Sequence, residues 1–394
     1  MKKRISVLGA TGSIGKSAID IITRDPDNFE IVLLGANSNR SKLEELSNQF
    51  PEADCVLTEK DGNEKLLSAI KNAGADMTIN GISGAAGLLP SIAALESGSN
   101  LALANKETIV MAGNLALNLA KKKNVNIIPV DSEHSAVFNL LKSADNGALS
   151  EIILTASGGP FRNFSPEEMK NITIEDALAH PTWKMGHKIT IDSASMANKG
   201  LEIIEACVFF NMEPEKIKVV IHPQSIVHSM IRLCNGVIYA QLSKPDMRHP
   251  IHDALYFPKT SPSSLDHLNF DSLTLEFSKP DSEKFPMLTL AWEAAKRAGL
   301  YPCAYNAANE IAVEAFLKQR IGFLDIAKVT EHVMEADWTN AAPTLEEILY
   351  ADANARLRAD RFVRELETGS KGRNRRAFVR STKIIPRKIQ GSMN

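Results

Sequence analysis

The feature that most constrains the fold is a glycine-rich segment near the N-terminus. Gly9, Gly12 and Gly15 lie between the apolar run Arg4–Leu8, which reads as a strand, and the helical pattern Ser17–Thr23. Glycines at this spacing let the backbone turn tightly and approach a pyrophosphate at the N-terminus of a helix. The order strand, glycine loop and helix therefore predicts a dinucleotide-binding domain, although a purely structural turn would show the same glycines.

Strand and helix patterns alternate through residues 1–130. Further strands are expected at Glu30–Gly35, Asp54–Leu57, Met77–Asn80, Asn100–Ala104 and Asn126–Pro129. Such alternation indicates a parallel sheet with helices on both faces, so we expect an α/β fold that begins with a Rossmann-like domain.

A second α/β domain is expected over residues 131–257. Its strands are predicted at Glu151–Thr155, Lys188–Ile191, Lys218–Ile221, Ile226–Leu233 and Val237–Leu242. The last two are joined through an Asn-Gly pair, which is a strong hairpin signal. One helix is expected in this region, at Gly200–Asn211.

The rest of the chain divides into three segments. Residues 258–286 are rich in Pro, Ser and Asp and read as a linker. Helical apolar spacing over residues 287–366 predicts a small helical domain. Residues 367–394 form a basic tail, because residues 368–394 hold eight Lys or Arg and no Asp or Glu. We favour an extension without a fold of its own, or a remnant of expression, over a tether for nucleic acid or membranes.

Charge and cysteine content exclude several classes of protein. The 394 residues carry a net charge of -2 and so lack the overall basic field of nucleic-acid binders. No apolar run approaches the roughly 18 residues of a membrane-spanning helix. Four widely spaced cysteines indicate reduced thiols, a cytoplasmic location and no zinc site. We therefore expect no nucleic-acid or membrane partner.

The segments after the second and fifth strands narrow the choice of dinucleotide. Asn37, Ser38 and Asn39 offer no carboxylate for the ribose hydroxyls of NADH, and Arg40 suits a 2′-phosphate, which favours NADPH. The alternative is that Arg40 is a solvated loop charge. The polar triplet Asn105–Glu107 lies where such sheets bind ligands, unless it is an ordinary helix start.

Acidic residues in two places suggest a metal site. Asp131 and Glu133 follow the sixth strand and would point to the same side of an extended chain, which suits a hard ion such as Mg²⁺ or Mn²⁺. Glu202 and Glu205 lie at i, i+3 on a helix that is apolar on several sides. A helix N-terminus that favours acidic residues, or an ordinary amphipathic helix, would give the same patterns.

Three loops suit the binding or covering of a phosphorylated ligand. Thr155–Phe161 places a hydroxyl among small residues, and Asp192–Lys199 offers hydroxyls, an amide and an ammonium at a helix N-terminus. The loop His180–His187 carries Trp183 and reads either as a lid that excludes water or as a static loop anchored by its aromatic ring. His228 reads as a packed residue rather than a ligand.

In their order along the chain, these segments resemble the 1-deoxy-D-xylulose 5-phosphate reductoisomerase family, which makes 2-C-methyl-D-erythritol 4-phosphate for isoprenoid synthesis. The matching strings are GATGSIG (9–15), GAAGLLP (84–90), LANKE (103–107), PVDSEH (129–134), SGGPF (157–161), HPTWKMG (180–186), IDSASMANKGLE (191–202), IHPQS (221–225), PDMR (245–248), NAANE (306–310) and DANAR (352–356). Several are long and unusual, and the basic tail has no counterpart in them.

The resemblance implies a homodimer with an N-terminal NADPH domain, a central domain for catalysis and dimerisation, and a C-terminal helical bundle. It assigns Mg²⁺ or Mn²⁺ to Asp131, Glu133 and Glu202, with Glu205 in support. The catalytic residues it implies are Lys106, Asp131, Glu133, His180 and Glu202. The substrate contacts are Lys106, Ser132, Glu133, Ser157, His180, Trp183, Ser193, Asn198, Lys199 and Glu202. The cofactor contacts are Thr11, Gly12, Ser13, Ile14, Asn37, Ser38, Asn39, Asn105, Glu107 and Gly186.

The reaction so implied rearranges the carbon skeleton of a sugar phosphate and then reduces the product with hydride from NADPH. The rearrangement is either a retro-aldol/aldol sequence or an α-ketol shift, with the metal as Lewis acid. Two alternatives stay open, namely an NADPH enzyme for another sugar phosphate and a non-catalytic NADPH-binding regulator. A semialdehyde dehydrogenase is disfavoured because no cysteine lies in a catalytic context.

Overall fold

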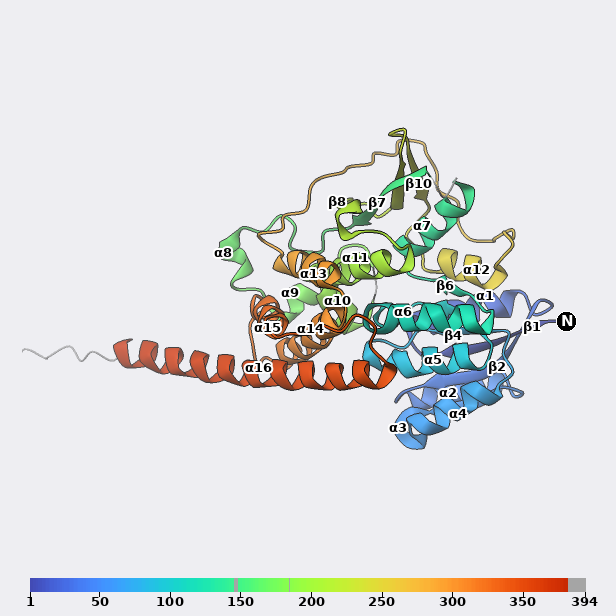
Figure 1. Ribbon diagram of the computed structural model, residues 1–394, viewed down its shortest axis with the longest axis horizontal. Coiled ribbons are helices and arrows are strands. Elements are labelled where there is room, and N and C mark those ends of the chain that lie inside the picture. The colour runs from blue at the N-terminus through green and yellow to red at the C-terminus, as the bar shows by residue number, and fades with distance from the viewer. Residues whose placement is uncertain (145–147, 184, 382–394) are drawn as a thin grey trace, which may run out of the picture.

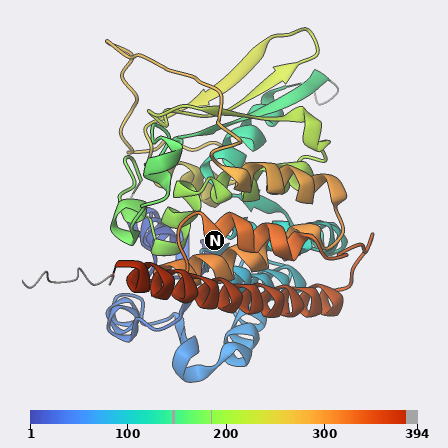
Figure 2. The same ribbon diagram turned by 90° about the vertical axis from the view of Figure 1, so that its left-hand side faces the viewer.

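The computed structural model describes residues 1–144, 148–183 and 185–381, with side chains as far as residue 368. The chain forms two sheets and a layer of C-terminal helices, and its last helix, α16 (Leu345–Ser381), extends beyond the body of the molecule (Figure 1). Figure 2 shows α16 alongside the other C-terminal helices. No helix in the described part of the chain combines the length and the apolar character needed to cross a bilayer.

The N-terminal sheet has six parallel strands in the order β3-β2-β1-β4-β5-β6. This order is that of a Rossmann-like fold, and it confirms the class predicted from the alternating pattern. The strands are β1 (Lys3–Leu8), β2 (Phe29–Ala36), β3 (Asp54–Leu57), β4 (Met77–Asn80), β5 (Asn100–Leu103) and β6 (Ile127–Pro129). In sheets of this kind, ligands bind beyond the carboxyl ends of the strands.

Helices cover both faces of this sheet. They are α1 (Ser13–Arg24), α2 (Arg40–Gln49), α3 (Thr58–Asp61), α4 (Asn63–Asn72), α5 (Leu88–Glu96) and α6 (Lys106–Lys123). A later helix, α12 (Arg248–Tyr256), adds Ile251 and Leu255 to the apolar cluster on the face that α1 covers. Lys3 Nζ donates to the carbonyl oxygen of Leu255 at 2.7 Å, so α12 is also tied to β1.

The central sheet has four strands in the order β10-β9-β7-β8, and only the β7–β8 pair is parallel. The strands are β7 (Leu149–Ala156), β8 (Ile217–Ile221), β9 (Val227–Leu233) and β10 (Ile238–Leu242). The predicted hairpin is confirmed as the antiparallel β9–β10 pair. The helices of this region are α7 (Ser132–Ser143), α8 (Pro166–Met169), α9 (Ile174–Leu178), α10 (His187–Ala194) and α11 (Ala197–Phe209).

One predicted strand is wrong. Residues 188–191 belong to the helix α10. The alternation of isoleucine with polar residues suggested a strand, but Lys188 and Asp192 form an ion pair of 2.9 Å at i, i+4, which is a helical spacing. Ile191 is buried in the main core, so tertiary packing outweighs the strand preference of its side chain.

Four helices form the C-terminal region: α13 (Pro286–Arg297), α14 (Tyr301–Leu317), α15 (Asp325–Met334) and α16. α14 packs against both α15 and α16 and also touches α10, while α13 packs on α11. One continuous apolar cluster therefore joins this region to the central region and to one face of the N-terminal sheet. Residues 258–285, all described, contain no helix and touch a sheet strand through the bridge between Ser278 and Ile221.

The last helix continues past the boundary that the sequence suggested. The sequence predicts that the helical domain ends at residue 366, yet α16 runs without interruption to Ser381. Gly369 and Gly372 both lie within this helix, and each glycine costs only about 1 kcal/mol relative to alanine, so neither by itself ends a long helix. Residues 382–394 of the basic tail lie outside the described residues.

Candidate active site

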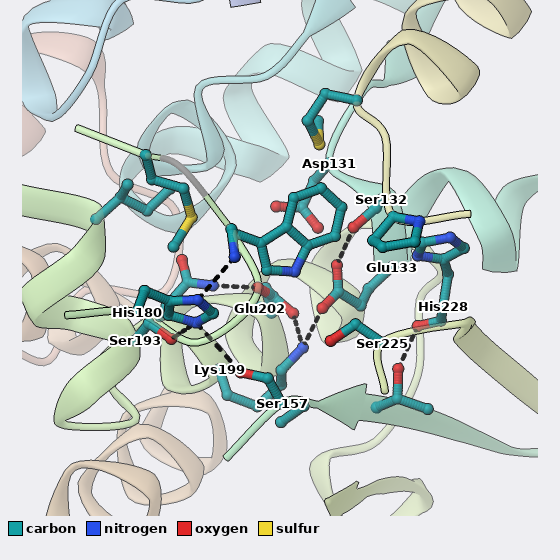
Figure 3. A pocket seen from close by; sticks show the side chains of 18 of the residues that line it. Asp131, Ser132, Glu133, Ser157, His180, Ser193, Lys199, Glu202, Ser225 and His228 are labelled. Carbon is teal, nitrogen blue, oxygen red and sulfur yellow. Dashed lines mark hydrogen bonds and ion pairs between the residues drawn. The ribbon is translucent and has the colours of Figure 1, made fainter. Parts of the chain in front are cut away.

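A pocket lies where the carboxyl ends of β5, β6 and β7 face α10 and α11 (Figure 3). β5 and β6 belong to the N-terminal sheet and β7 to the central sheet, so the wall contains segments from both sheets. Each of these strands ends at the pocket and is followed there by polar residues. All the catalytic and substrate residues expected from the sequence line it: Lys106, Asp131, Ser132, Glu133, Ser157, His180, Trp183, Ser193, Asn198, Lys199 and Glu202. The structure thus brings them together, while the role of each stays a prediction.

The glycine loop brings the start of α1 to this pocket. Gly9 has a φ of +74°, and a Cβ atom there would lie 2.7 Å from the carbonyl oxygen of Gly81. A Cβ at Gly15 would lie 2.4 Å from the carbonyl oxygen of Gly9, so neither position admits a side chain. Ser13 and Ile14, the first residues of α1, line the pocket. A helix N-terminus so placed suits an anionic ligand.

Three carboxylates converge in the pocket. Asp131, Glu133 and Glu202 each offer one oxygen, and these oxygens lie within 4.8 Å of one another. Asp131 precedes α7 and Glu133 lies in its first turn, so the extended chain assumed from the sequence is wrong although the side chains converge. Glu202 reaches in from α11. Carboxylate oxygens alone are the donor set that Mg²⁺ and Mn²⁺ prefer.

Two buried ammonium groups lie among these carboxylates. Lys106 Nζ is 2.7 Å from Asp131 Oδ2 and 3.0 Å from Glu202 Oε1. Lys199 Nζ is 2.6 Å from Glu133 Oε1 and also pairs with Glu202. Burial raises the pKa of Asp131, but the ammonium of Lys106 holds it well below its usual range. Burial raises the pKa of Glu202, and the ammonium groups of Lys106 and Lys199 oppose this effect. The charge and donor type of the cluster fit a divalent metal.

His134 and Glu205 support the cluster from α7 and α11. His134 Nδ1 lies 3.3 Å from Asp131 Oδ1 and 3.4 Å from Glu205 Oε2, and His134 Nε2 lies 3.1 Å from the carbonyl oxygen of Glu202. Burial lowers the pKa of His134, but the carboxylates of Glu205 and Asp131 raise it to about 9. Burial raises the pKa of Glu205 to about 7. Partners of this kind orient metal ligands.

Hydroxyl and amide groups also line the pocket. His180 Nε2 lies 3.0 Å from Ser193 Oγ and 3.3 Å from Ser157 Oγ. Burial lowers the pKa of His180, so its ring is neutral near pH 7. Asn198 accepts from Lys106 Nζ at 2.8 Å and donates to Glu202 Oε1 at 2.6 Å. These groups match the hydroxyl and phosphate oxygens of a sugar phosphate.

The expected lid begins at His180. His180 Nδ1 accepts hydrogen bonds from the backbone N–H groups of Thr182 and Trp183, at 3.1 and 2.9 Å. Trp183 and Met185 line the pocket, so their side chains are placed to shield a ligand from water. Lys184, within the same loop, lies outside the described residues. Whether this loop moves stays a prediction.

The remaining predicted cofactor residues lie outside the pocket wall. Asn37 accepts from Thr58 Oγ1 at 2.9 Å, and Asn39 caps α2 by accepting from the N–H of Lys42 at 3.2 Å. Arg40 pairs with Glu44 at 2.7 Å, so its guanidinium has a partner within α2. The others, Thr11, Gly12, Ser38, Asn105, Glu107 and Gly186, are also absent from the wall, and their roles stay predictions.

Sequence reasoning missed part of the wall. His228, interpreted from the sequence as a packed residue, is buried and also lines the pocket. Its Nε2 lies 2.8 Å from Ser243 Oγ, and burial lowers its pKa. Asp246 and Met247 line the pocket as well. Only the string PDMR could have marked these two residues, because no local pattern predicts which loop of the second sheet turns back toward the first.

Models of known families match most of this chain. That of 1-deoxy-D-xylulose 5-phosphate reductoisomerase matches residues 5–71 and 41–113, and that of its C-terminal domain matches residues 127–210. A model described as DXP reductoisomerase C-terminal domain matches residues 242–358. The chain belongs to the 1-deoxy-D-xylulose 5-phosphate reductoisomerase family. The three matched segments correspond in order to the N-terminal, central and C-terminal regions of the fold.

Individual proteins and structures agree. The chain is 49% identical over 375 residues to 1-deoxy-D-xylulose 5-phosphate reductoisomerase of Treponema denticola, covering 93% of this chain and 98% of that protein. It is 47% identical to the Pelodictyon phaeoclathratiforme protein of the same name, over 92% of this chain and 100% of that one.

Solved structures of reductoisomerases share the fold. A crystal structure of DOX-P reductoisomerase in complex with NADPH, fosmidomycin and magnesium matches with a TM-score of 0.86 and 36% identity, over 93% of this chain and 99% of that chain. The Zymomonas mobilis enzyme in complex with NADPH matches with a TM-score of 0.83 and 40% identity, over 92% of this chain and 99% of that chain.

Proposed function

We propose that this family member binds NADPH, Mg²⁺ or Mn²⁺ and 1-deoxy-D-xylulose 5-phosphate in the pocket, and converts the sugar phosphate to 2-C-methyl-D-erythritol 4-phosphate for isoprenoid synthesis. The observation that carries the proposal is the cluster of Asp131, Glu133 and Glu202 carboxylates beside the glycine loop at Gly9–Gly15. Two similar structures support it, one in complex with NADPH, fosmidomycin and magnesium and one in complex with NADPH.

The three carboxylates hold the metal, with His134 and Glu205 orienting them. When bound, the metal polarises carbonyl and hydroxyl oxygens as a Lewis acid, and NADPH supplies a hydride. Lys106 and Lys199 present ammonium groups at the same place, where they stabilise negative charge that develops on substrate oxygens.

Hydroxyl and amide groups in the pocket bind the rest of the substrate. Ser157, Ser193 and Asn198 offer hydroxyl and amide groups to the phosphate and the sugar hydroxyls. His180, neutral because burial lowers its pKa, lies between the two serines and orients them. Trp183 covers the pocket and keeps water from the reactive intermediate. Binding, orientation and exclusion of water are thus divided among separate segments of the chain.

We also propose a homodimer, which the exposed edge of the central sheet supports. β10 is the edge strand. Ile238 and Tyr239 at its start, and Val237 directly before it, expose 43–47% of their surface. An unpaired apolar edge of this kind suits pairing with the same edge of a second copy.

The four cysteines are free, which agrees with a reducing compartment such as the cytoplasm.

The decisive experiment follows the loss of NADPH absorbance when 1-deoxy-D-xylulose 5-phosphate and Mg²⁺ or Mn²⁺ are added. We expect oxidation that stops with excess chelator and is lost in Asp131→Ala. A folded protein that binds NADPH but does not oxidise it with this substrate would contradict the proposal. Oxidation with a different sugar phosphate alone would support the alternative substrate.

A further inference from the structure

The short helix α10 links the expected lid to the substrate wall. It begins directly after Gly186 and carries Ser193, whose hydroxyl lies 3.0 Å from His180 Nε2. An isolated helix of eight residues is not stable in water. Contacts with other elements must therefore hold α10 in place. The same contacts hold Ser193 and its partner His180, which both line the pocket.

One ionic chain, in which Lys188 is half-buried and its two acidic partners are buried, provides these contacts on the side of α10 that does not line the pocket. Lys188 Nζ lies 2.9 Å from Asp192 Oδ2 within α10 and 2.8 Å from Glu107 Oε1 on α6. Asp192 Oδ1 accepts a hydrogen bond of 2.8 Å from Asn309 Nδ2 on α14. Asp192 and Asn309 are buried, so a lost partner there would not be replaced easily by water.

The chain continues from Glu107 to the metal site. Glu107 Oε2 accepts from Asn105 Nδ2 at 2.9 Å, and the same amide group donates to the carbonyl oxygens of Ile82 and Gly84. Asn105 and Glu107 are the neighbours of Lys106, whose ammonium lies among the metal-site carboxylates. Lys188 therefore joins α10 to the turn that places Lys106.

The C-terminal helices support both ends of this chain. Glu310 on α14 accepts from the N–H of Ala85 at 2.9 Å, next to the loop that Asn105 binds, and pairs with Arg356 on α16 at 2.6 Å. Burial lowers the pKa of Lys188, but the carboxylates of Asp192, Glu107 and Glu310 outweigh this effect. The net pKa lies above the usual value of a lysine, so Lys188 stays charged. A cation at this point compensates carboxylates from three different segments.

We propose that Lys188 is a positioning residue for the reaction: through Glu107 and Asp192 it fixes α10 against α6 and α14, and so sets where Ser193 and His180 lie. This inference rests on the proposed function of the pocket. Lys188, Asp192 and Asn309 are absent from the pocket wall, so replacing them removes no direct contact with a substrate in it.

The test replaces Lys188 by Met, which removes the charge and keeps an unbranched apolar side chain. Steady-state kcat and KM for 1-deoxy-D-xylulose 5-phosphate are measured well below the unfolding temperature. We expect kcat/KM to fall roughly 10- to 100-fold, as for misplaced catalytic groups, and Lys188→Arg to recover part of the loss. Lys318→Met, which breaks an exposed ion pair with Glu314 on α14, is the matched control and should leave kcat/KM unchanged.

A second readout reports the lid itself. The chain has three tryptophans, of which Trp183 lies in the lid loop. With a fluorotryptophan label, its fluorine-19 resonance can be assigned from Trp183→Phe. We expect this resonance to shift or broaden in Lys188→Met and to stay unchanged in Lys318→Met. If Lys188 only adds stability, Lys188→Met should lower the unfolding temperature and leave this resonance and kcat/KM unchanged.

The outcomes separate this inference from the proposed function. If the wild-type protein turns over and Lys188→Met keeps its kcat, KM and Trp183 resonance, the positioning role is overturned while the proposed function stands. If the wild-type protein does not turn over, the proposed function fails, and the resonance still tests the ionic chain. If Lys188→Met does not fold, Asn309→Ala, which removes the bond from α14 to Asp192, is measured in the same way and decides the question.

Discussion

Lys106 Nζ lies 2.7 Å from Asp131 Oδ2, although the two residues follow different strands. β5 and β6 are parallel neighbours, so the residues after their carboxyl ends meet at one edge of the sheet. The ammonium of Lys106 balances part of the negative charge that a bound metal ion would otherwise balance. Together with Lys199 it leaves the three carboxylates one positive charge short of neutrality. Three carboxylates facing two lysines leave a charge of about -1, which a divalent ion overcompensates unless an anionic substrate binds with it.

Asp131→Asn should remove metal-dependent turnover and preserve the fold. Outer partners of metal ligands typically contribute 10- to 100-fold to affinity or activity, so losing a ligand should cost at least about 100-fold in kcat/KM. NADPH oxidation over a series of Mg²⁺ concentrations measures the effect. Asp325→Asn, at a half-buried residue that pairs with the exposed Lys328 and does not line the pocket, is the control. An unchanged Mg²⁺ response in Asp131→Asn would refute the metal assignment.

Mg²⁺ should stabilise the wild-type protein against heat. A ligand that binds only the folded state adds about 2.7 kcal/mol at 100 times its Kd. The unfolding temperature should therefore rise with added Mg²⁺ in the wild-type protein and stay nearly constant in Asp131→Asn. Na⁺ at matched ionic strength controls for screening of surface charges. Equal shifts in both proteins would mean that the ion binds elsewhere.

Gly15→Ala should abolish NADPH binding, because a Cβ there would lie 2.4 Å from the carbonyl oxygen of Gly9. The loop would have to move away from the pocket, and the N-terminus of α1 would move with it. Fluorescence titration with NADPH measures the loss. Gly322→Ala, where a Cβ would meet Asp325 at an ordinary 3.4 Å, should bind normally. Wild-type NADPH affinity in Gly15→Ala would place the dinucleotide away from this loop.

The sequence was informative where function depends on local chemistry. The glycine loop and the apolar strands predict the N-terminal fold correctly, because each of these patterns can be recognised from residues that are adjacent in the sequence. Asp131 and Glu133 lie together as the sequence predicts, although their backbone is not extended, because carboxylates after a strand end face the ligand edge either way. Their role as metal ligands stays a prediction. The resemblance, rather than spacing, joined Glu202 to them.

Long-range contacts explain what the sequence did not predict. Residues 188–191 alternate as a strand does, and only their packing against α6 and α14 makes the helical spacing of Lys188 and Asp192 favourable. Glu107 was expected to contact the cofactor, and its carboxylate is bound by Asn105 and Lys188. Its partner Lys188 is 81 residues away along the chain, so no local pattern could have revealed the pair.

The contribution of His228 to the stability of the folded protein should fall as the pH falls, because this side chain is buried. Burial lowers its pKa below the unfolded value near 6.5, so the unfolded state binds protons more readily. The stabilising effect is present above pH 6.5 and is lost as the pH falls through 6.5 toward the folded pKa. Unfolding temperatures at pH 7.5 and 5.5 should differ less in His228→Gln than in the wild-type protein. Equal differences would show that His228 is protonated as easily in the folded state.

Tyr239→Lys should weaken the proposed dimer. The side chain is 47% exposed on the edge strand β10, and a lysine there both repels its symmetry mate and discourages strand pairing. Central interface residues often contribute about 2 kcal/mol or more, which is roughly a 30-fold change in the dimer Kd. Sedimentation velocity over a concentration series measures that Kd. Tyr350→Lys, at a residue that is 72% exposed on α16, controls for the added charge. If both variants sediment like the wild-type protein, the second copy does not pair through β10, because a lysine at the centre of that interface would be felt in the dissociation constant.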